Sequence, residues 1–277
     1  SIFLLDLIYL NYDIPDLGPY FLPAFMVTAL WTGGGMCEAL SMLRDRLRLK
    51  GVLANAGRAT AILACLITLL VVRYPRLSGG GDYVAYDFGV DVLRSIGRDG
   101  ICITNNWDIY SPILYLRYIQ GIRRDVVMVD KELLRRSWYF GYLRREYPWL
   151  IERSEKEIQS YLALLEDFEE GRLRDPGDIQ KRFVAMINSF ISRNLKDRPI
   201  YLTFVNGFDR DAADIAEGYS KIPWGLVYRV GSEPGLRSFD YKALSPRRGL
   251  DLSVPMEERV ELNLSIYPRM TMERAMY

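Results

Sequence analysis

Apolar and polar residues come in blocks between Ile101 and Asp130, and the order of the blocks predicts the local secondary structure. An apolar run at residues 101–104 ends in a polar turn at 105–108, and helical spacing follows over 110–122. A second β-branched run covers residues 126–129. This order predicts a strand, a helix and a second strand, with the two strands parallel and the crossover right-handed.

Polar residues follow both predicted strands at the edge where ligands of such units bind. Asn105 and Asp108 come after the first strand, and Asp130 ends the second strand. We therefore expect these side chains to contact a ligand. Each carboxylate can also cap a neighbouring helix, and this structural alternative stays open.

The patterns after residue 130 indicate a small, mainly parallel α/β sheet with helices on its faces. A third strand is predicted at residues 199–205 and a fourth at 225–230, with a short helix at 209–219 between them. The other predicted helices cover residues 83–96, 133–147, 154–170 and 176–195.

Two long apolar stretches precede this domain and predict transmembrane helices. Residues 20–43 and 52–72 are long enough to cross a bilayer, which requires roughly 20 residues, and Glu38 and Arg58 are their only charges. The connector between them is basic, which places it in the cytoplasm by the positive-inside rule. The following domain is then extracytoplasmic.

The expected fold class is α/β: the last transmembrane helices of a polytopic bundle, followed by a small, mainly parallel α/β extracytoplasmic domain. We expect the helices in residues 1–76, the domain in 77–235, and an irregular C-terminal extension in 236–277. A further helix is expected to begin at Pro268. The sequence starts inside an apolar run without Met, which predicts a fragment of a longer protein.

Composition narrows the possible chemistry. The formal net charge is +1, so no nucleic-acid partner is expected. The chain contains no His, which excludes Ser-His-Asp catalysis and His-ligated metals. Cys37, Cys65 and Cys102 lie far apart in apolar segments, which favours buried free thiols over a zinc site or disulfides. No metal site and no cofactor are expected.

A short acidic loop precedes the first apolar stretch and faces the same side as the domain in this topology. Asp13 and Asp16 flank Pro15 in the sequence NYDIPD. Acidic residues are favoured at a helix N-terminus, so a capping role and a functional role both stay open. We take Asp13 and Asp16, together with Asn105 and Asp108, as candidate donor or acceptor contacts.

Three blocks, in the right order, resemble the DUF2723 family of polytopic proteins, which includes protein O-mannosyltransferases. NYDIPDLGPYFLPAFMVTALW is similar to a late transmembrane segment of that family. ITNNWDIYSPILYLRYIQGIRRDVVMVDKELLRRSWYFGYLR is similar to the family's signature after its last span, including Pro112 and the Trp138-Tyr139 pair. Arg198-Pro199-Ile200-Tyr201 resembles the family's next strand opening.

The resemblance implies a GT-C-type membrane glycosyltransferase. Such an enzyme moves a sugar, mannose in the O-mannosyltransferases, from a polyprenyl-phosphate donor to a hydroxyl of an extracytoplasmic protein or glycan. It implies a lipid bilayer as partner and a soluble domain in the periplasm, at the cell surface or in the ER lumen. The family's catalytic acid lies in an early loop that this sequence lacks, so no catalytic residue is expected here. Of the family's acidic turn, only Asp108 is retained.

Two other interpretations remain. One is a non-catalytic, membrane-anchored binding or scaffold domain outside the cytoplasm. The other is a soluble α/β enzyme, which requires residues 20–72 to be part of a buried core.

Overall fold

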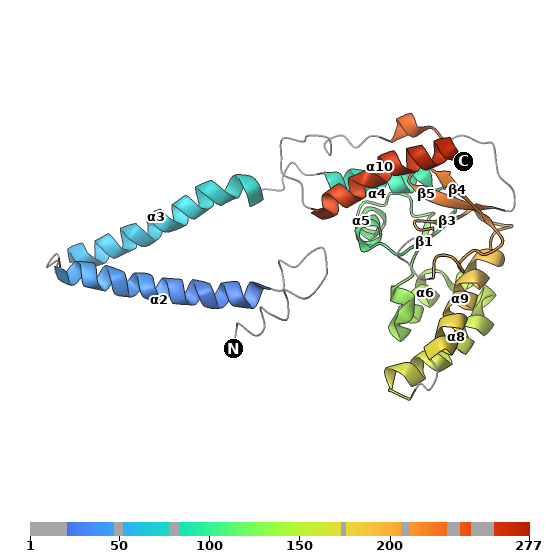
Figure 1. Cartoon of the computed structure of the whole chain (residues 1–277), viewed down its shortest axis with the longest axis horizontal. Helices are drawn as coiled ribbons and strands as arrows, with labels where there is room; N and C mark the ends of the chain where they lie inside the picture. The colour runs from blue at the N-terminus through green and yellow to red at the C-terminus, as the bar shows by residue number, and fades with distance from the viewer. Residues whose placement is uncertain are drawn as a thin grey trace. The chain divides into compact units, whose positions relative to one another are not determined.

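A computed structural model divides the chain into two units, Ser1–Asp82 and Tyr83–Tyr277, which are described separately (Figure 1). The structure describes residues 21–46, 52–77, 83–172, 176–205, 211–231, 239–244 and 258–277. Asp13 and Asp16 lie outside these residues.

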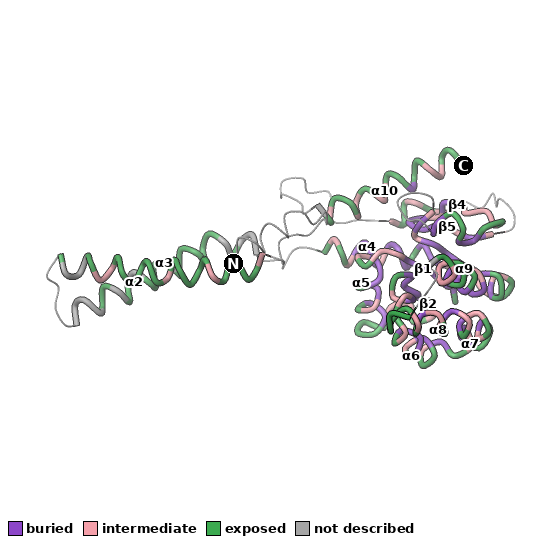
Figure 2. The backbone as a smooth tube through the Cα atoms, turned by 60° about the horizontal axis from the view of Figure 1, so that its bottom comes forward, coloured by how far each residue is buried: buried purple, intermediate pink, exposed green. Residues whose placement is uncertain are grey.

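The first unit contains two long helices, α2 (Leu22–Arg46) and α3 (Val52–Leu77). Their large apolar side chains are widely exposed, with Trp31 at 76 % and Leu70 at 63 %. Figure 2 colours much of both helices as exposed. Threonine hydroxyls in both helices donate to carbonyls one turn earlier, as Thr28 does to Ala24 at 2.8 Å. Such back-bonding satisfies the hydroxyl within the helix. These helices therefore expose mainly apolar surface.

The predicted transmembrane bundle is wrong. Within the described residues, no helix combines the length and the apolar character that crossing a membrane requires. Gly33, Gly34 and Gly35 dilute the apolar content of α2. In α3, the nearly unbroken aliphatic part covers only residues 62–72, which is shorter than the roughly 20 residues that a span needs.

The second unit is organised around a mixed five-stranded sheet in the order β2-β1-β3-β5-β4, all in described residues. β1 (Ile101–Thr104) pairs in parallel with β2 (Val127–Asp130) and with β3 (Ile200–Leu202). β5 (Val227–Gly231) pairs antiparallel with both β3 and β4 (Ser220–Trp224). The predicted parallel βαβ unit is confirmed, whereas the prediction of a mainly parallel sheet is wrong.

The antiparallel half arises from a hairpin that the sequence pattern did not reveal. Trp224 pairs with Val227 across a two-residue turn that begins with Gly225. Gly225 has a φ of +61°, a conformation that costs glycine little. Pro223 lies in β4, and an edge strand tolerates the missing N–H of proline.

The short helix predicted at residues 209–219 is also wrong in its described part. Residues 211–218 form turns. Ala216 and Gly218 have φ values of +58° and +79°, which a right-handed helix does not allow. This segment precedes the outer strand β4 and belongs to the connection from β3.

Helices lie on both faces of the sheet (Figure 1). α4 (Val84–Ser95) precedes β1, and α5 (Trp107–Tyr118) connects β1 to β2. The others are η3 (Leu133–Arg135), α6 (Ser137–Glu146), α7 (Pro148–Arg153), α8 (Glu155–Glu169), α9 (Pro176–Ser192), η4 (Tyr241–Ala243) and α10 (Glu258–Met276).

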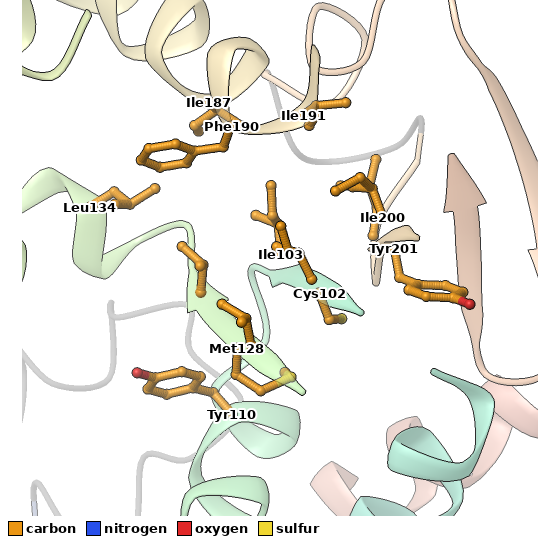
Figure 3. Close-up of a cluster of buried hydrophobic side chains, with 14 of the residues drawn as sticks. Cys102, Ile103, Tyr110, Met128, Leu134, Ile187, Phe190, Ile191, Ile200 and Tyr201 are labelled. Carbon is orange, nitrogen blue, oxygen red and sulfur yellow. The ribbon is translucent and has the colours of Figure 1, made fainter. Parts of the chain in front are cut away.

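The core occupies both faces of the three parallel strands (Figure 3). Cys102, Met128 and Tyr201 share one register position and point to the side of Tyr110 on α5. Ile103 points to the opposite side, toward residues of α9. Each of these side chains is at most 3 % exposed. The strands thus bury both faces, as their continuous apolar runs predict.

The C-terminal helix α10 packs on α4 and β4. Met270 is fully buried, and the ring of Tyr267 lies 6.0 Å from that of Phe88. The Tyr267 hydroxyl also donates a hydrogen bond to Asp91 Oδ2 at 2.9 Å. α10 begins at Glu258, ten residues before Pro268, so Pro268 lies inside the helix instead of starting it.

Candidate functional site at the carboxyl edge of the sheet

The carboxyl edge of the parallel strands gathers the polar residues that the sequence placed there. The hydroxyl of Thr203, directly after β3, donates a hydrogen bond to the hydroxyl of Thr104 in β1 at 2.9 Å. The backbone N–H of Lys131, directly after β2, donates to the Thr104 carbonyl at 2.7 Å. The ends of β1, β2 and β3 are therefore tied together at this edge.

The turn after β1 builds the start of α5. Asn106 is the N-cap residue, and its side-chain Oδ1 accepts the Asp108 backbone N–H at 2.8 Å. The Asn106 N–H in turn donates to the Thr104 hydroxyl at 3.1 Å. Because the cap satisfies a helix N–H that has no partner within the helix, Asn106 has a structural role here. Asn105 lies beside it, partly exposed.

Asp108 faces α10 and is partly exposed. Its Oδ1 lies 3.6 Å from the Arg259 guanidinium, which comes from the first turn of α10. Both side chains retain solvent contact, at 29 % and 47 % exposure, so this ion pair is weak. The structure thus brings Asp108 together with the C-terminal helix.

Asp130 is buried at the end of β2 and starts the 3₁₀ turn η3. Its Oδ1 accepts the Leu133 N–H at 2.8 Å, and its own N–H donates to the Tyr139 hydroxyl at 3.1 Å. Tyr139 and Tyr110 share a further hydroxyl contact at 2.9 Å. Burial raises the pKa of the Asp130 carboxyl, and the hydrogen bond from Leu133 opposes that rise.

A buried ionic network next to this edge was not foreseen from the sequence. Lys131 Nζ lies 3.1 Å from Asp211 Oδ2 and 3.0 Å from Glu132 Oε1, with only 2 % of its side chain exposed. Arg135 contacts the same Asp211 oxygen at 2.5 Å. Gln180 of α9 donates to the other Asp211 oxygen at 2.5 Å. The network fixes the segment after β3 to the end of β2 and to α9.

No sequence signal pointed to this pairing because Lys131 and Asp211 are 80 positions apart. The only local hint is that Lys131 follows a predicted buried strand, where a charged residue needs a partner. Among the described residues, the network joins two basic side chains (Lys131 and Arg135) to two acidic side chains (Glu132 and Asp211).

The described candidate residues of the edge are engaged within the chain. Asn106, Asp108 and Asp130 each serve a cap or an ion pair within the chain. Within the described residues, no three Asp, Glu, Cys or His side chains gather as metal ligands do. Burial raises the pKa of the Cys102 thiol far above its usual range, which makes it a poor nucleophile. Cys37 is exposed, against the prediction of a buried thiol.

Comparisons of the chain with protein-family models, with curated proteins and with solved structures found no match. The resemblance to the DUF2723 family therefore stays a prediction.

Proposed function

We propose that this chain is the C-terminal part of a glycosyltransferase that uses a polyprenyl-phosphate-linked sugar. In this proposal the second unit is a non-catalytic domain that binds the hydroxyl-bearing acceptor, a protein or a glycan. The sugar, mannose in the resembled enzymes, and the extracytoplasmic position stay predictions of the resemblance.

One observation supports the non-catalytic role: the acidic residues described at this edge form hydrogen bonds and ion pairs with other residues of the chain. An inverting sugar transfer needs a carboxylate that can take the acceptor proton. Asp130 is buried and accepts the N–H of Leu133, and Asp211 is held by Lys131 and Arg135. Asp108, the acid that stays accessible, is paired with Arg259. Among the described residues of this edge, no carboxylate is therefore positioned as a base.

The first unit supports a lipid-linked donor. Its helices expose large aliphatic side chains along α3, among them Leu66, Leu70 and Val72 at 55–63 %. Exposed apolar surface of this extent marks an interaction site. A polyprenyl chain is itself aliphatic, so burial of such a chain against α3 removes apolar area from water on both sides. A bilayer as a further partner stays a prediction.

The deciding experiment measures sugar transfer by the full-length protein from a labelled polyprenyl-phosphate mannose. Asp13→Asn and Asp16→Asn should each lower turnover at least about tenfold, if this loop contacts the reacting groups. Asp108→Asn is the matched control, and turnover should stay within about twofold because that acid has only a weak ion pair. A large loss in Asp108→Asn with none in the loop variants would contradict the proposal.

A full-length protein without any transfer activity would favour the second candidate, a non-catalytic binding or scaffold protein. The engagement of the described edge residues within the chain favours this candidate as well. Binding of an acceptor without turnover would identify it.

A further inference from the structure

Aromatic side chains of α5 and α6 form a continuous series of contacts in the second unit. The Trp138 ring lies 5.7 Å from the Tyr139 ring, which is stacked on the Tyr142 ring at 5.4 Å. The Tyr142 hydroxyl is hydrogen-bonded to the Tyr118 hydroxyl at 2.8 Å. Each of these side chains therefore contacts the next. We refer to Trp138, Tyr139, Tyr142 and Tyr118, in this order, as the aromatic row.

A second tryptophan joins the aromatic row through the start of α5. The Trp107 ring lies 5.8 Å from the Tyr110 ring, and the Tyr110 hydroxyl is hydrogen-bonded to that of Tyr139 at 2.9 Å. Met128, whose thioether oxidants convert to a polar sulfoxide, points to the side of Tyr110 (Figure 3). The row therefore lies beside a part of the core that oxidation would damage.

The ends of this system are open to solvent, whereas its middle is buried. Trp107 and Trp138 are 53 % and 62 % exposed, and Tyr118 is 43 % exposed. Tyr110 and Tyr139 are at most 2 % exposed. An oxidant in solution therefore reaches the two indoles and the Tyr118 ring, but it does not reach the buried phenols between them.

The Tyr118 end of the row has a proton acceptor. The Tyr118 hydroxyl donates to Glu146 Oε2 at 3.0 Å. The Tyr139 hydroxyl instead contacts the Tyr110 hydroxyl and the Asp130 N–H, and it has no hydrogen bond to a carboxylate among the described residues. A phenol that loses one electron at neutral pH also releases its proton, which requires a base within hydrogen-bond reach. The geometry therefore favours an oxidised phenol at Tyr118 over one at Tyr139.

We propose that the aromatic row carries a one-electron oxidation from its exposed tryptophans to Tyr118, with organic peroxyl radicals (ROO•) as the oxidant. An indole gives one electron and its N–H proton to ROO•, which becomes the hydroperoxide ROOH. An electron from Tyr118 then passes through Tyr142 and Tyr139 to the indolyl radical, which regains its proton from water. The Tyr118 proton moves to Glu146, and the phenol becomes a phenoxyl radical.

The net reaction converts ROO• and the Tyr118 phenol into ROOH and the Tyr118 phenoxyl radical. Glu146 passes the proton on to water. A thiol in solution then gives a hydrogen atom to the exposed phenoxyl radical, which restores the phenol and leaves a thiyl radical. The relay thus protects the indoles and the core around Met128 from lasting oxidation. It is independent of the proposed function, because it involves neither a sugar nor a lipid donor.

The test exposes the full chain to peroxyl radicals from a decomposing azo initiator, with N-acetyl-tryptophanamide as the reference for the radical dose. Peptide mass spectrometry measures oxygen addition at Trp107 and Trp138. Tyr142→Phe interrupts the row, because a phenyl ring is far harder to oxidise than a phenol, so oxidation of both tryptophans should rise several-fold. Tyr115→Phe is the matched control: it removes a phenol of α5 that is 51 % exposed and outside the row. This variant should match the parent.

Glu146→Gln tests the proton acceptor without removal of any ring. Glutamine keeps an acceptor oxygen but takes up no proton at neutral pH. A positioned base contributes about 100-fold or more to a proton transfer, so the yield of phenoxyl radical in freeze-quenched samples should fall at least about tenfold by electron paramagnetic resonance. Oxidation of the tryptophans should rise in this variant too. Glu152→Gln, an exposed acid on α7, is the control.

Circular dichroism shows whether each variant keeps the fold of the parent. Equal tryptophan oxidation in the parent, Tyr142→Phe and Glu146→Gln would overturn the relay. A rise in Tyr115→Phe as large as that in Tyr142→Phe would also overturn it, because loss of any phenol of α5 would then have the same effect. An unchanged phenoxyl yield in Glu146→Gln would remove Glu146 as the proton acceptor and contradict the proposal.

Discussion

At the scale of single residues, the second unit pairs several of its charged side chains with one another. Lys131, Arg135, Glu132 and Asp211 form ion pairs beside the sheet edge. Arg123 forms two hydrogen bonds to Asp125 and also donates to the carbonyls of the last turn of α4. A guanidinium at that position adds hydrogen bonds to carbonyls at the helix C-terminus, where few backbone donors are available. These side chains stabilise loops whose backbone has little regular structure.

Loss of the Asp211 charge should destabilise the protein strongly. Asp211→Asn leaves Lys131 and Arg135 without their shared carboxylate, and Lys131 is buried. Breaking a buried ion pair costs about 3–5 kcal/mol, and we expect a loss at the lower end because Glu132 still contacts both cations. The measurement is urea unfolding at neutral pH.

The control for this experiment is Asp178→Asn, which removes an exposed ion pair with Arg182 at 3.5 Å. Exposed pairs contribute about 0–1 kcal/mol. Equal unfolding free energies for the two variants would show that the network around Lys131 does not stabilise the fold.

Low pH should weaken the ion pair between Asp125 and Arg123. Hydrogen bonds from Arg123 lower the pKa of this carboxyl to about 2 from its usual 3.8. Since the folded pKa is the lower one, ionised Asp125 stabilises the fold above about pH 3.8, and this contribution is lost as pH falls toward 2. The stability difference between the parent and Asp125→Asn should therefore be constant near neutral pH and shrink between about pH 4 and 2. A difference independent of pH would contradict the assigned pKa.

At the scale of elements, the pattern of apolar and polar residues correctly predicted the strands and the helix of the βαβ unit. The run at residues 101–104 is β1, and the parallel partner predicted at 126–129 is β2, shifted by one residue. The helix between them starts at Trp107, three residues earlier than the periodicity indicated, because Asn106 caps it. Caps and periodicity are local properties, so sequence alone can show them.

The sequence did not predict features that depend on contacts between residues far apart in the chain. β4, which contains Pro223, was not predicted: proline is tolerated in an edge strand, and sequence alone does not show which strand is at the edge. The same limit applies to the candidate site: Asp108 was correctly placed at the carboxyl edge, but its pairing with Arg259 joins residues 151 positions apart. The sequence pattern also predicted transmembrane helices at α2 and α3, which do not combine the length and apolar character that crossing a membrane requires.

The hairpin turn should be sensitive to its glycine. A Cβ atom at Gly225 would lie 2.2 Å from Ser95 Oγ, and the residue has a φ of +61°. Ser95 Oγ also accepts the Leu226 N–H at 3.0 Å, so the contact cannot relax without loss of that bond. Gly225→Ala should lower the free energy of unfolding by about 1–3 kcal/mol from backbone strain, with the steric contact added to that loss.

Gly141 offers the matched control in thermal unfolding. It lies within α6, and a Cβ there would meet no atom within 4 Å. Gly141→Ala should therefore raise the free energy of unfolding by about 0.5–1 kcal/mol, because alanine favours the helix. Destabilisation by both variants would show that the effect at Gly225 is not specific to its turn.

At the scale of the whole molecule, the buried core belongs to the second unit. The core cluster runs from Phe88 to Val230, and Met270 of α10 adds a fully buried side chain. In α2 and α3, by contrast, the described large apolar side chains are mostly exposed. The second unit therefore holds the packing that a stable domain needs, whereas the described part of the first unit leaves most of its large apolar side chains exposed.

Residues 83–277 expressed alone should therefore fold. We expect a single cooperative thermal transition, because the core cluster and the sheet ladder both lie within this unit. Residues 83–244 are the informative comparison, since they lack α10 and expose the surface that Met270 and Tyr267 cover. Removal of a buried methionine side chain alone costs about 2–5 kcal/mol, so the shorter chain should melt at a clearly lower temperature. If the two chains melted alike, α10 would not be part of the folded domain, and its contact with Asp108 would have no structural consequence.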